Sequence, residues 1–175
     1  MTEQTEILIV DDEAETRELL ADFCRSLGLQ VATAHDGRAA LAAVQRTPHQ
    51  FSVVLTDLHM PGADGFEVLR AVRAANPSCY VVIITGYATL DTAVRAVKEG
   101  AYDYLAKPFA LGQLEIVLSR IRDRMALERE NRDLSRQVLG GRPAPTGRLD
   151  VAGRLDAIES RLAAIETLLH ALARS

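Results

Sequence analysis

The sequence contains no apolar run close to the length of about 20 residues that a membrane-spanning helix needs. Its first residues also lack a basic stretch followed by an apolar core, which is the pattern of a signal peptide. We therefore expect a cytoplasmic protein with no membrane partner. Cysteine is scarce too, since Cys24 and Cys79 are the only two. They fit neither a disulfide framework nor a metal-ligand spacing, and we expect both to fill space in or near the core.

Positive charge is also limited. Acidic side chains outnumber basic ones over residues 1–105, and the whole chain has a formal net charge of −4. The basic residues of 106–175 alternate with acidic ones, as they do on solvated helices. We therefore expect no direct binding to nucleic acid. Lys98 and Lys107 are the only lysines among 20 basic residues, which hints at a site that needs a compact point charge.

Short apolar runs alternate with helical patterns along the chain. Strands are predicted at 7–10, 29–34, 51–56, 80–84 and 102–106, and helices at 13–27, 37–46, 65–75, 89–99 and 111–139. Such a succession of βα units predicts an α/β fold with a parallel sheet and helices on both faces. The functional site of such a sheet lies beyond the carboxyl ends of its strands, at a topological switch point.

Polar residues stand at four of these strand ends: Asp11 with Asp12, Asp57, Thr85 and Lys107. The carboxylates would repel one another unless a cation lay between them, and oxygen ligands of this kind suit Mg²⁺. A carboxylate can attack a phosphoryl group, while an ammonium group and a hydroxyl group bind the phosphoryl oxygens. Each residue alone is more often a cap, a turn residue or a solvated charge. The prediction of a phosphoacceptor therefore depends on their coincidence at one edge of the sheet.

The motifs that carry these residues resemble those of the receiver domain of two-component response regulators. They are Val10-Asp11-Asp12-Glu13, Thr56-Asp57-Leu58-His59-Met60-Pro61-Gly62 with Asp64-Gly65, Ile84-Thr85-Gly86, and Tyr104-Leu105-Ala106-Lys107-Pro108-Phe109. The resemblance spans about 5–122 and implies a (βα)5 doubly wound sheet with the flavodoxin-like order 2-1-3-4-5. It implies that a histidine kinase or phosphotransfer protein phosphorylates Asp57, in single-cycle signalling and not in enzymatic turnover.

The resemblance also implies how the site works. Asp12 would bind Mg²⁺ directly and Asp11 through a water molecule, beside Asp57, and the backbone carbonyl of His59 would be a further ligand. Lys107 would pair with the phosphoryl group, and the X-Pro bond that follows it resembles the cis peptide of the family.

The resemblance also implies which residues respond to phosphorylation and which determine how long the phosphoryl group lasts. Thr85 and Tyr104 would form the switch pair, so that the face around residues 86–106 changes shape and recruits a downstream protein. His59 and Tyr87 stand where the family controls access of the attacking water. Both are bulky here, so we expect hydrolysis to be hindered and the phosphoryl group to last for minutes or longer. The alternative for His59 is an exposed loop residue with only a backbone role.

The chain continues past the resemblance without a recognisable output domain. We expect the receiver domain at 1–122, a helical extension of the fifth helix at 123–139, a Gly/Pro linker at 140–150 and an amphipathic helix at 151–175. A frayed linker is the alternative for the extension.

Apolar residues of the last segment recur at steps of three and four, as in a coiled coil. They are Leu155, Ile158, Leu162, Ile165, Leu169 and Leu172. In a parallel pair, Arg154 and Arg161 would face Glu159 and Glu166 of a neighbouring copy, which favours a parallel homo-oligomer. The alternative is an amphipathic helix packed on its own receiver domain.

Three functions follow from these patterns. The first is a response regulator that signals through protein–protein interaction or oligomerisation. The second is a DNA-binding transcriptional regulator whose output domain is absent from this sequence. The third is a phosphatase that turns over an aspartyl phosphate, which would need a second acid–base carboxylate and a cap over the substrate, and no insertion is large enough for such a cap.

Overall fold

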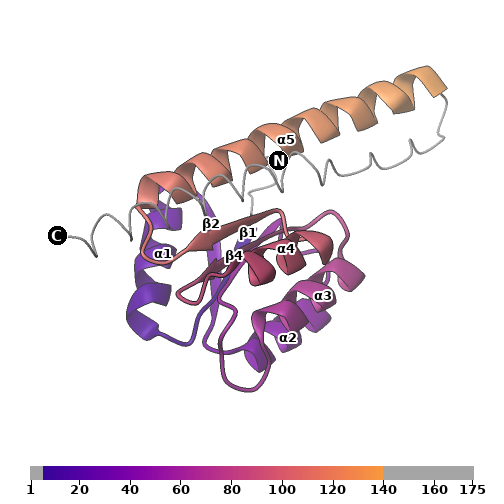
Figure 1. Ribbon diagram of the computed structural model, residues 1–175. Coiled ribbons are helices and arrows are strands. Elements are labelled where there is room, and N and C mark those ends of the chain that lie inside the picture. Colours follow the sequence, from indigo (N-terminus) through magenta and orange to yellow (C-terminus); the bar gives the residue numbers. More distant parts are fainter. Residues whose placement is uncertain (1–5, 140–175) are drawn as a thin grey trace. The chain divides into compact units, whose positions relative to one another are not determined.

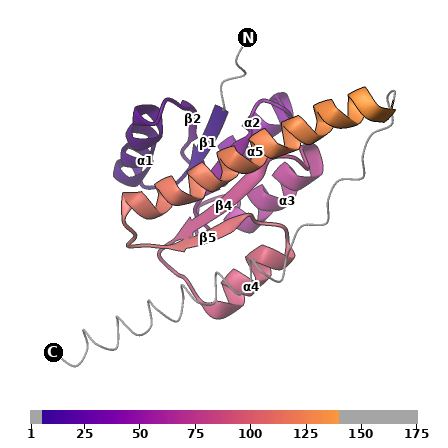
Figure 2. The ribbon, with the colours of Figure 1, turned by 90° about the horizontal axis from the view of Figure 1, so that it is seen from above.

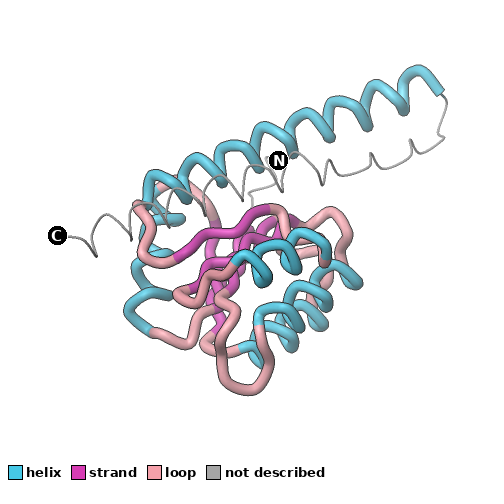
Figure 3. Tube along the Cα trace, viewed as in Figure 1, coloured by secondary structure: helices cyan, strands magenta, loops and turns pink. Residues whose placement is uncertain are grey.

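Strands and helices alternate throughout the computed structural model, which describes residues 6–139 (Figure 1). The elements are β1 (Glu6–Val10), α1 (Ala14–Ser26), β2 (Gln30–Ala34), α2 (Gly37–Arg46), β3 (Val53–Thr56), α3 (Gly65–Ala75), β4 (Tyr80–Thr85), α4 (Leu90–Lys98), β5 (Asp103–Ala106) and α5 (Leu111–Leu139). In Figure 3 the strands are magenta, and a pink loop follows each of them before the next helix begins.

The five strands form one parallel sheet in the order β2-β1-β3-β4-β5, which confirms the predicted flavodoxin-like arrangement. The chain passes from β1 to β2 on one side and then returns to place β3 on the other side of β1. This reversal is the topological switch point of a doubly wound sheet. In the register of β1 and β3, Val10 lies opposite Thr56. The next residues, Asp11 and Asp57, therefore leave the sheet side by side.

Alternate residues of the strands face opposite sides of the sheet. On one side, Leu8, Val54 and Ile83 belong to a buried apolar cluster with residues of α2, α3 and α4. Ile7 and Ile9 have the opposite parity and are completely buried. Figures 1 and 2 show α1 on the other side of the sheet from α2, α3 and α4. The prediction of helices on both faces is thus confirmed.

Side-chain caps fix where several helices begin. Asp36 accepts a hydrogen bond from Ala39 N at 2.7 Å at the start of α2. Asp64 accepts from Glu67 N at 2.8 Å, and Glu67 accepts in return from Asp64 N, which forms a capping box at α3. A cap satisfies amide groups that have no partner inside the helix, so it determines the first turn. The predicted bounds of α2 and α3 agree with the structure at both ends.

The predicted bounds of α5 also agree with the structure. Those of the other elements differ by one or two residues at one or both ends, most clearly at β3, which begins at Val53 and not at Phe51. The prediction of a helix at 13–27 used the spacing of Leu19, Leu20, Phe23 and Leu27, but the Leu19 side chain is 56% exposed. The buried residues of α1 are Leu20, Ala21 and Cys24. No helix within residues 6–139 combines the length and the apolar character that a membrane span requires.

The residues up to Pro108 belong to one compact unit, and α5 belongs to a second unit, which begins at Phe109. The apolar spacing at the start of α5 predicts a core face of four residues, and all four are buried: Leu114, Val117, Leu118 and Ile121. The predicted linker at 140–150 and the helix at 151–175, with its six oligomerisation residues, lie outside the described residues.

Both thiols are free and buried, which confirms the prediction for Cys24 and Cys79. Burial raises the pKa of each thiol from 9.0 to about 12. Because the thiolate is the reactive form, we expect neither cysteine of the folded protein to react with a maleimide or an aromatic disulfide at pH 8. Both should react fully in denaturant, and intact mass at timed intervals would count the labelled thiols. Native labelling as fast as that of a small thiol would contradict this expectation.

The same pKa shift has a consequence for stability. Above pH 9 the unfolded chain loses thiol protons that the folded chain retains. The free energy of unfolding should therefore fall as the pH rises from 9 towards 12, and these two groups should contribute no such dependence below that range.

Candidate functional site

Four strands deliver polar side chains to the carboxyl edge of the sheet. Asp11 directly follows β1, Asp57 follows β3 and Lys107 follows β5, while Thr85 is the last residue of β4. The parallel register puts Thr85 opposite Ala106, the residue before Lys107. Residues that are 96 positions apart in the chain are thereby brought within hydrogen-bond distance, as Lys107 and Asp11 show.

Three carboxyl groups gather at this edge. Asp11, Asp12 and Asp57 each place a carboxylate oxygen within 4.8 Å of the others. Asp11 is 2% exposed and Asp57 is 9% exposed, while Asp12 lies in solvent. Burial raises the pKa of Asp11, and its hydrogen bond to Lys107 offsets part of that shift. Three converging carboxylates, of which those of Asp11 and Asp57 are buried, fit a hard divalent cation such as Mg²⁺.

The carboxylate of Asp57 is oriented by its own loop. Its Oδ1 accepts hydrogen bonds from Leu58 N and, at 3.2 Å, from His59 N. Its Oδ2 lies 3.1 Å from Lys107 Nζ. Backbone amides hold one oxygen while a cation faces the other, so the group has a fixed orientation before any ligand binds.

The ammonium group of Lys107 lies between two carboxylates. Its Nζ donates to Asp11 Oδ2 at 2.8 Å as well as to Asp57. Burial alone would lower the pKa of Lys107, but the bond to Asp11 and the charges of Asp57 and Asp11 outweigh it, so the pKa is raised. Lys107 therefore stays charged at neutral pH. The Lys107–Pro108 peptide is cis, as the resemblance implied.

Thr85 and Tyr104, the two residues predicted to form a switch pair, lie in the neighbouring strands β4 and β5. Thr85 is completely buried, and its Oγ1 accepts from Tyr87 N at 3.2 Å. Tyr104 in β5 is 2% exposed, and its hydroxyl shares a hydrogen bond of 2.8 Å with Thr92 Oγ1 in α4. Burial raises the pKa of Tyr104 although hydrogen bonds with Thr92 and the Thr89 backbone oppose the shift.

The two residues predicted to slow phosphoryl loss, His59 and Tyr87, are in contact with each other. The rings of His59 and Tyr87 have centroids 4.8 Å apart and planes tilted by 56°. They come from the loops after β3 and β4, and Tyr87 is 71% exposed. The ring contact thus joins the loop after β3, whose His59 N donates to Asp57 Oδ1, to the loop after β4.

Sequence reasoning missed two residues around the site. Arg17 in α1 donates from Nη1 to the backbone oxygen of Asp11 at 2.8 Å, which ties the loop after β1 to α1. Thr92 holds the hydroxyl of Tyr104. The pattern Thr89-Leu90-Asp91-Thr92 resembles a capping sequence and was the available signal for Thr92, whereas nothing local in the sequence indicates Arg17.

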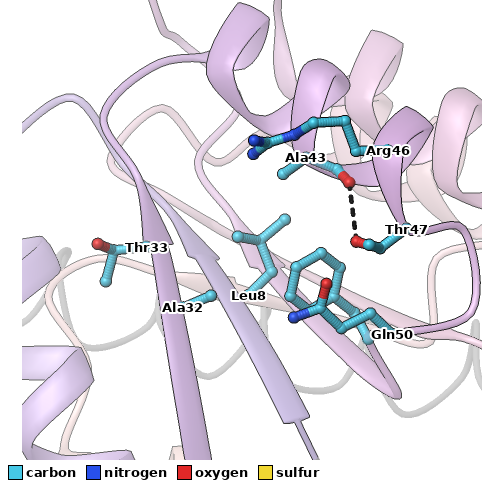
Figure 4. Close-up of a pocket in the computed structure, with 8 residues that line it drawn as sticks. Leu8, Ala32, Thr33, Ala43, Arg46, Thr47 and Gln50 are labelled. Carbon is cyan, nitrogen blue, oxygen red and sulfur yellow. Dashed lines mark hydrogen bonds between the residues drawn. The ribbon is translucent and has the colours of Figure 1, made fainter.

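A cavity of about 320 Å³ lies elsewhere, between α2 and the strands β1 and β2 (Figure 4). Leu8 and Phe51 contribute to its apolar lining, and Arg46 and Thr47 border it at the end of α2. The Thr47 hydroxyl is already bonded to Ala43 O at 3.2 Å. None of the predicted site residues lines this cavity, so it is separate from the acidic cluster.

Comparison with known proteins agrees with this geometry. The family model of the response regulator receiver domain matches residues 7–119. The transcriptional regulatory protein ZraR of Klebsiella oxytoca is 42% identical over 117 residues, which are 67% of this chain and 26% of that protein. The chain thus spans about a quarter of that relative's length.

Solved structures give the same result. A response regulator receiver domain protein from Clostridium thermocellum is 32% identical with a TM-score of 0.66, and the match covers 70% of this chain and 98% of that one. NtrX from Brucella abortus is 34% identical with a TM-score of 0.67, and the match covers 82% of this chain and 31% of that one. The chain therefore belongs to the response regulator receiver domain family.

Proposed function

We propose that this protein is a response regulator that accepts a phosphoryl group on Asp57 from a histidine kinase or a phosphotransfer protein. One observation carries the proposal: backbone amides bind Oδ1 of the Asp57 carboxylate, while Lys107 Nζ lies 3.1 Å from Oδ2. An oriented carboxylate beside a fixed cation suits nucleophilic attack on phosphorus.

The reaction forms one bond and breaks one. A carboxylate oxygen of Asp57 bonds to phosphorus, the bond from phosphorus to the donor's imidazole nitrogen breaks, and the imidazole keeps that electron pair and takes a proton from solvent. Lys107 would neutralise charge on the phosphoryl oxygens, and the hydroxyl of Thr85 would donate to one of them.

Asp11, Asp12, Asp57 and the backbone carbonyl of His59 would hold Mg²⁺ in this proposal. The ion would supply positive charge against the phosphoryl oxygens. The support is the convergence of three carboxylates within 4.8 Å of one another. Burial is the main reason why the pKa of Asp11 is raised, and the nearby charge of Asp57 adds to the shift.

The experiment uses a small acyl phosphate as donor. The full chain is incubated with acetyl phosphate and Mg²⁺, and intact mass is followed over time. We expect one added phosphoryl group, no addition in the presence of EDTA, and loss of the added mass on treatment with hydroxylamine, which cleaves acyl phosphates. No added mass with Mg²⁺ present would overturn the proposal.

We further propose that His59 and Tyr87 slow the loss of the phosphoryl group by shielding Asp57 from water. The contact of their rings supports this role. Because Tyr87 is 71% exposed, its replacement by alanine should leave the fold intact. The phosphorylated mass of the wild type should then decay over minutes or longer, and Tyr87→Ala should decay faster. A wild-type half-life of seconds would contradict the role.

The output is proposed to be an interaction with a downstream protein or with other copies of this chain, in the cytoplasm. The heptad pattern of 151–175 is the support for self-association. Light scattering with and without Mg²⁺ and beryllofluoride, which mimics an acyl phosphate, would show whether the mass of the assembly changes. Transcriptional regulation is the second candidate, because the longer relative ZraR is named a transcriptional regulatory protein.

A further inference from the structure

Three hydroxyl groups meet where α4 begins. Thr89 is the N-cap of α4, and its hydroxyl accepts from Thr92 N at 3.2 Å, while Thr92 Oγ1 accepts from Thr89 N at 3.1 Å. The third hydroxyl is that of Tyr104, which reaches Thr92 Oγ1 from β5 at 2.8 Å. The cap of α4 is therefore bonded to the Tyr104 hydroxyl of the neighbouring strand through Thr92 Oγ1, beside a bond with the backbone of Thr89.

The oxygen of Thr92 has more neighbours than it can bind at once. A hydroxyl donates one hydrogen bond and accepts two. Four groups lie within reach of Thr92 Oγ1: Thr89 N, the Thr89 hydroxyl at 2.9 Å, Thr89 O at 3.0 Å and the Tyr104 hydroxyl. A bond to Tyr104 thus competes with bonds inside the cap, so the position of Tyr104 affects how the first turn of α4 is closed.

The loop before α4 begins in the candidate site. Thr85 ends β4, and its hydroxyl holds Tyr87 N. If that hydroxyl turned to donate to a phosphoryl oxygen on Asp57, its orientation towards Tyr87 N would change. The loop that carries Tyr87 would then be held mainly at its far end, by the bonds among Thr89, Thr92 and Tyr104.

The other end of α4 is tied to α3. Glu99 accepts from Arg70 at 2.9 Å and from Arg95 at 2.7 Å, and the guanidinium of Arg95 lies 3.9 Å from the centre of the Phe66 ring. A change that starts in the loop after β4 therefore acts first on the amino-terminal turn of α4.

We propose that Thr92 is a positioning residue that couples the first turn of α4 to Tyr104, and so makes that turn respond to the phosphoryl group at Asp57. The inference rests on the function proposed for Asp57. Thr92 takes no part in phosphoryl transfer itself, so its replacement should alter the response and leave phosphoryl uptake in place.

The test measures amide hydrogen exchange by NMR in residues 86–93 of the full chain, with and without Mg²⁺ and beryllofluoride. Wild type should show a change of about five-fold, the value expected for one hydrogen bond. Thr92→Val should reduce this response to less than about two-fold, and Thr92→Ser, which keeps the hydroxyl, should retain it.

A second variant separates coupling from capping. Tyr104→Phe removes the hydroxyl that reaches Thr92 and leaves the cap residues Thr89 and Thr92 in place. Like Thr92→Val, it should lose the change in amide exchange that beryllofluoride causes in residues 86–93. The double variant Thr92→Val/Tyr104→Phe should lose no more of this change than either single variant. Only Thr92→Val should speed exchange of the cap amides in the absence of ligand.

The outcomes distinguish the two proposals. The coupling role would be overturned if Thr92→Val kept the full ligand-induced change in amide exchange. It would also be overturned if Thr92→Val lost this change while Tyr104→Phe kept it. Acetyl phosphate labelling of every variant accompanies the exchange data. If the wild type takes up no phosphoryl group, the function proposed for Asp57 fails, and the inference about Thr92 fails with it.

Discussion

Replacement of Asp57 by asparagine is expected to lower phosphoryl uptake by at least about 100-fold, because a carboxamide is a far weaker nucleophile than a carboxylate. Asparagine has nearly the same shape, and its oxygen can still accept from Leu58 N and His59 N. Lys107 would keep its bond to Asp11. The fold should therefore persist, and intact mass after incubation with acetyl phosphate and Mg²⁺ would measure the loss.

Asp64→Asn is the matched control for this change. Asp64 is exposed and caps α3, and asparagine is an equally good N-cap. The control should take up one phosphoryl group at the wild-type rate. If Asp57→Asn were labelled as fast as the control, another side chain would be the acceptor, and Asp12 would be the first to examine because it lies in the same cluster.

Replacement of Gly65 by alanine is expected to destabilise the protein by about 3 kcal/mol, as overpacking against backbone does. A Cβ at this position would lie 2.2 Å from the carbonyl oxygen of Asp57 and 2.9 Å from Leu58 Cα. These are backbone atoms at the end of a central strand, and they cannot turn away as a side chain can. The free energy of unfolding would be measured by urea denaturation.

The matched control is Gly112→Ala in α5, where nothing lies within 4 Å of the added Cβ. It should stabilise the protein by about 0.5 kcal/mol, because alanine favours the helix over glycine. Both substitutions replace glycine by alanine, yet they should change the free energy of unfolding in opposite directions. A loss of less than about 1 kcal/mol in Gly65→Ala would show that the start of α3 can move away from Asp57 at little cost.

The sequence allowed the sheet to be predicted, together with the proximity of Asp11, Asp57 and Lys107 at one of its edges, because apolar runs that end in polar residues identify both a strand and its carboxyl end. The bounds of α2 and α3, which begin at the caps Asp36 and Asp64, were predictable. The bounds of α4 were not fully predictable, since its capping box at Thr89 did not prevent a difference of one residue at each end. The position of Leu19 was not predictable from its spacing, since a helix on one side of a sheet buries only part of its apolar surface.

Contacts between distant segments could not be predicted from local patterns. The bond between Thr92 and Tyr104 depends on how α4 lies beside β5, and the bond from Arg17 to Asp11 O depends on the reach of one rotamer. The tilted contact between the His59 and Tyr87 rings depends in the same way on two loop conformations. Such contacts are set by tertiary packing, which is why they appear only once the elements are placed in space.

The position of Lys107 between Asp11 and Asp57 also affects the net charge of the cluster. The three aspartates and the ammonium group of Lys107 leave two formal negative charges at this edge of the sheet. The exposed carboxylate of Glu13, whose Oε2 lies 3.8 Å from Lys107 Nζ, adds a third. Lysine at 107 thus lowers the negative charge of the cluster by one and leaves an excess that a bound divalent cation would reduce further.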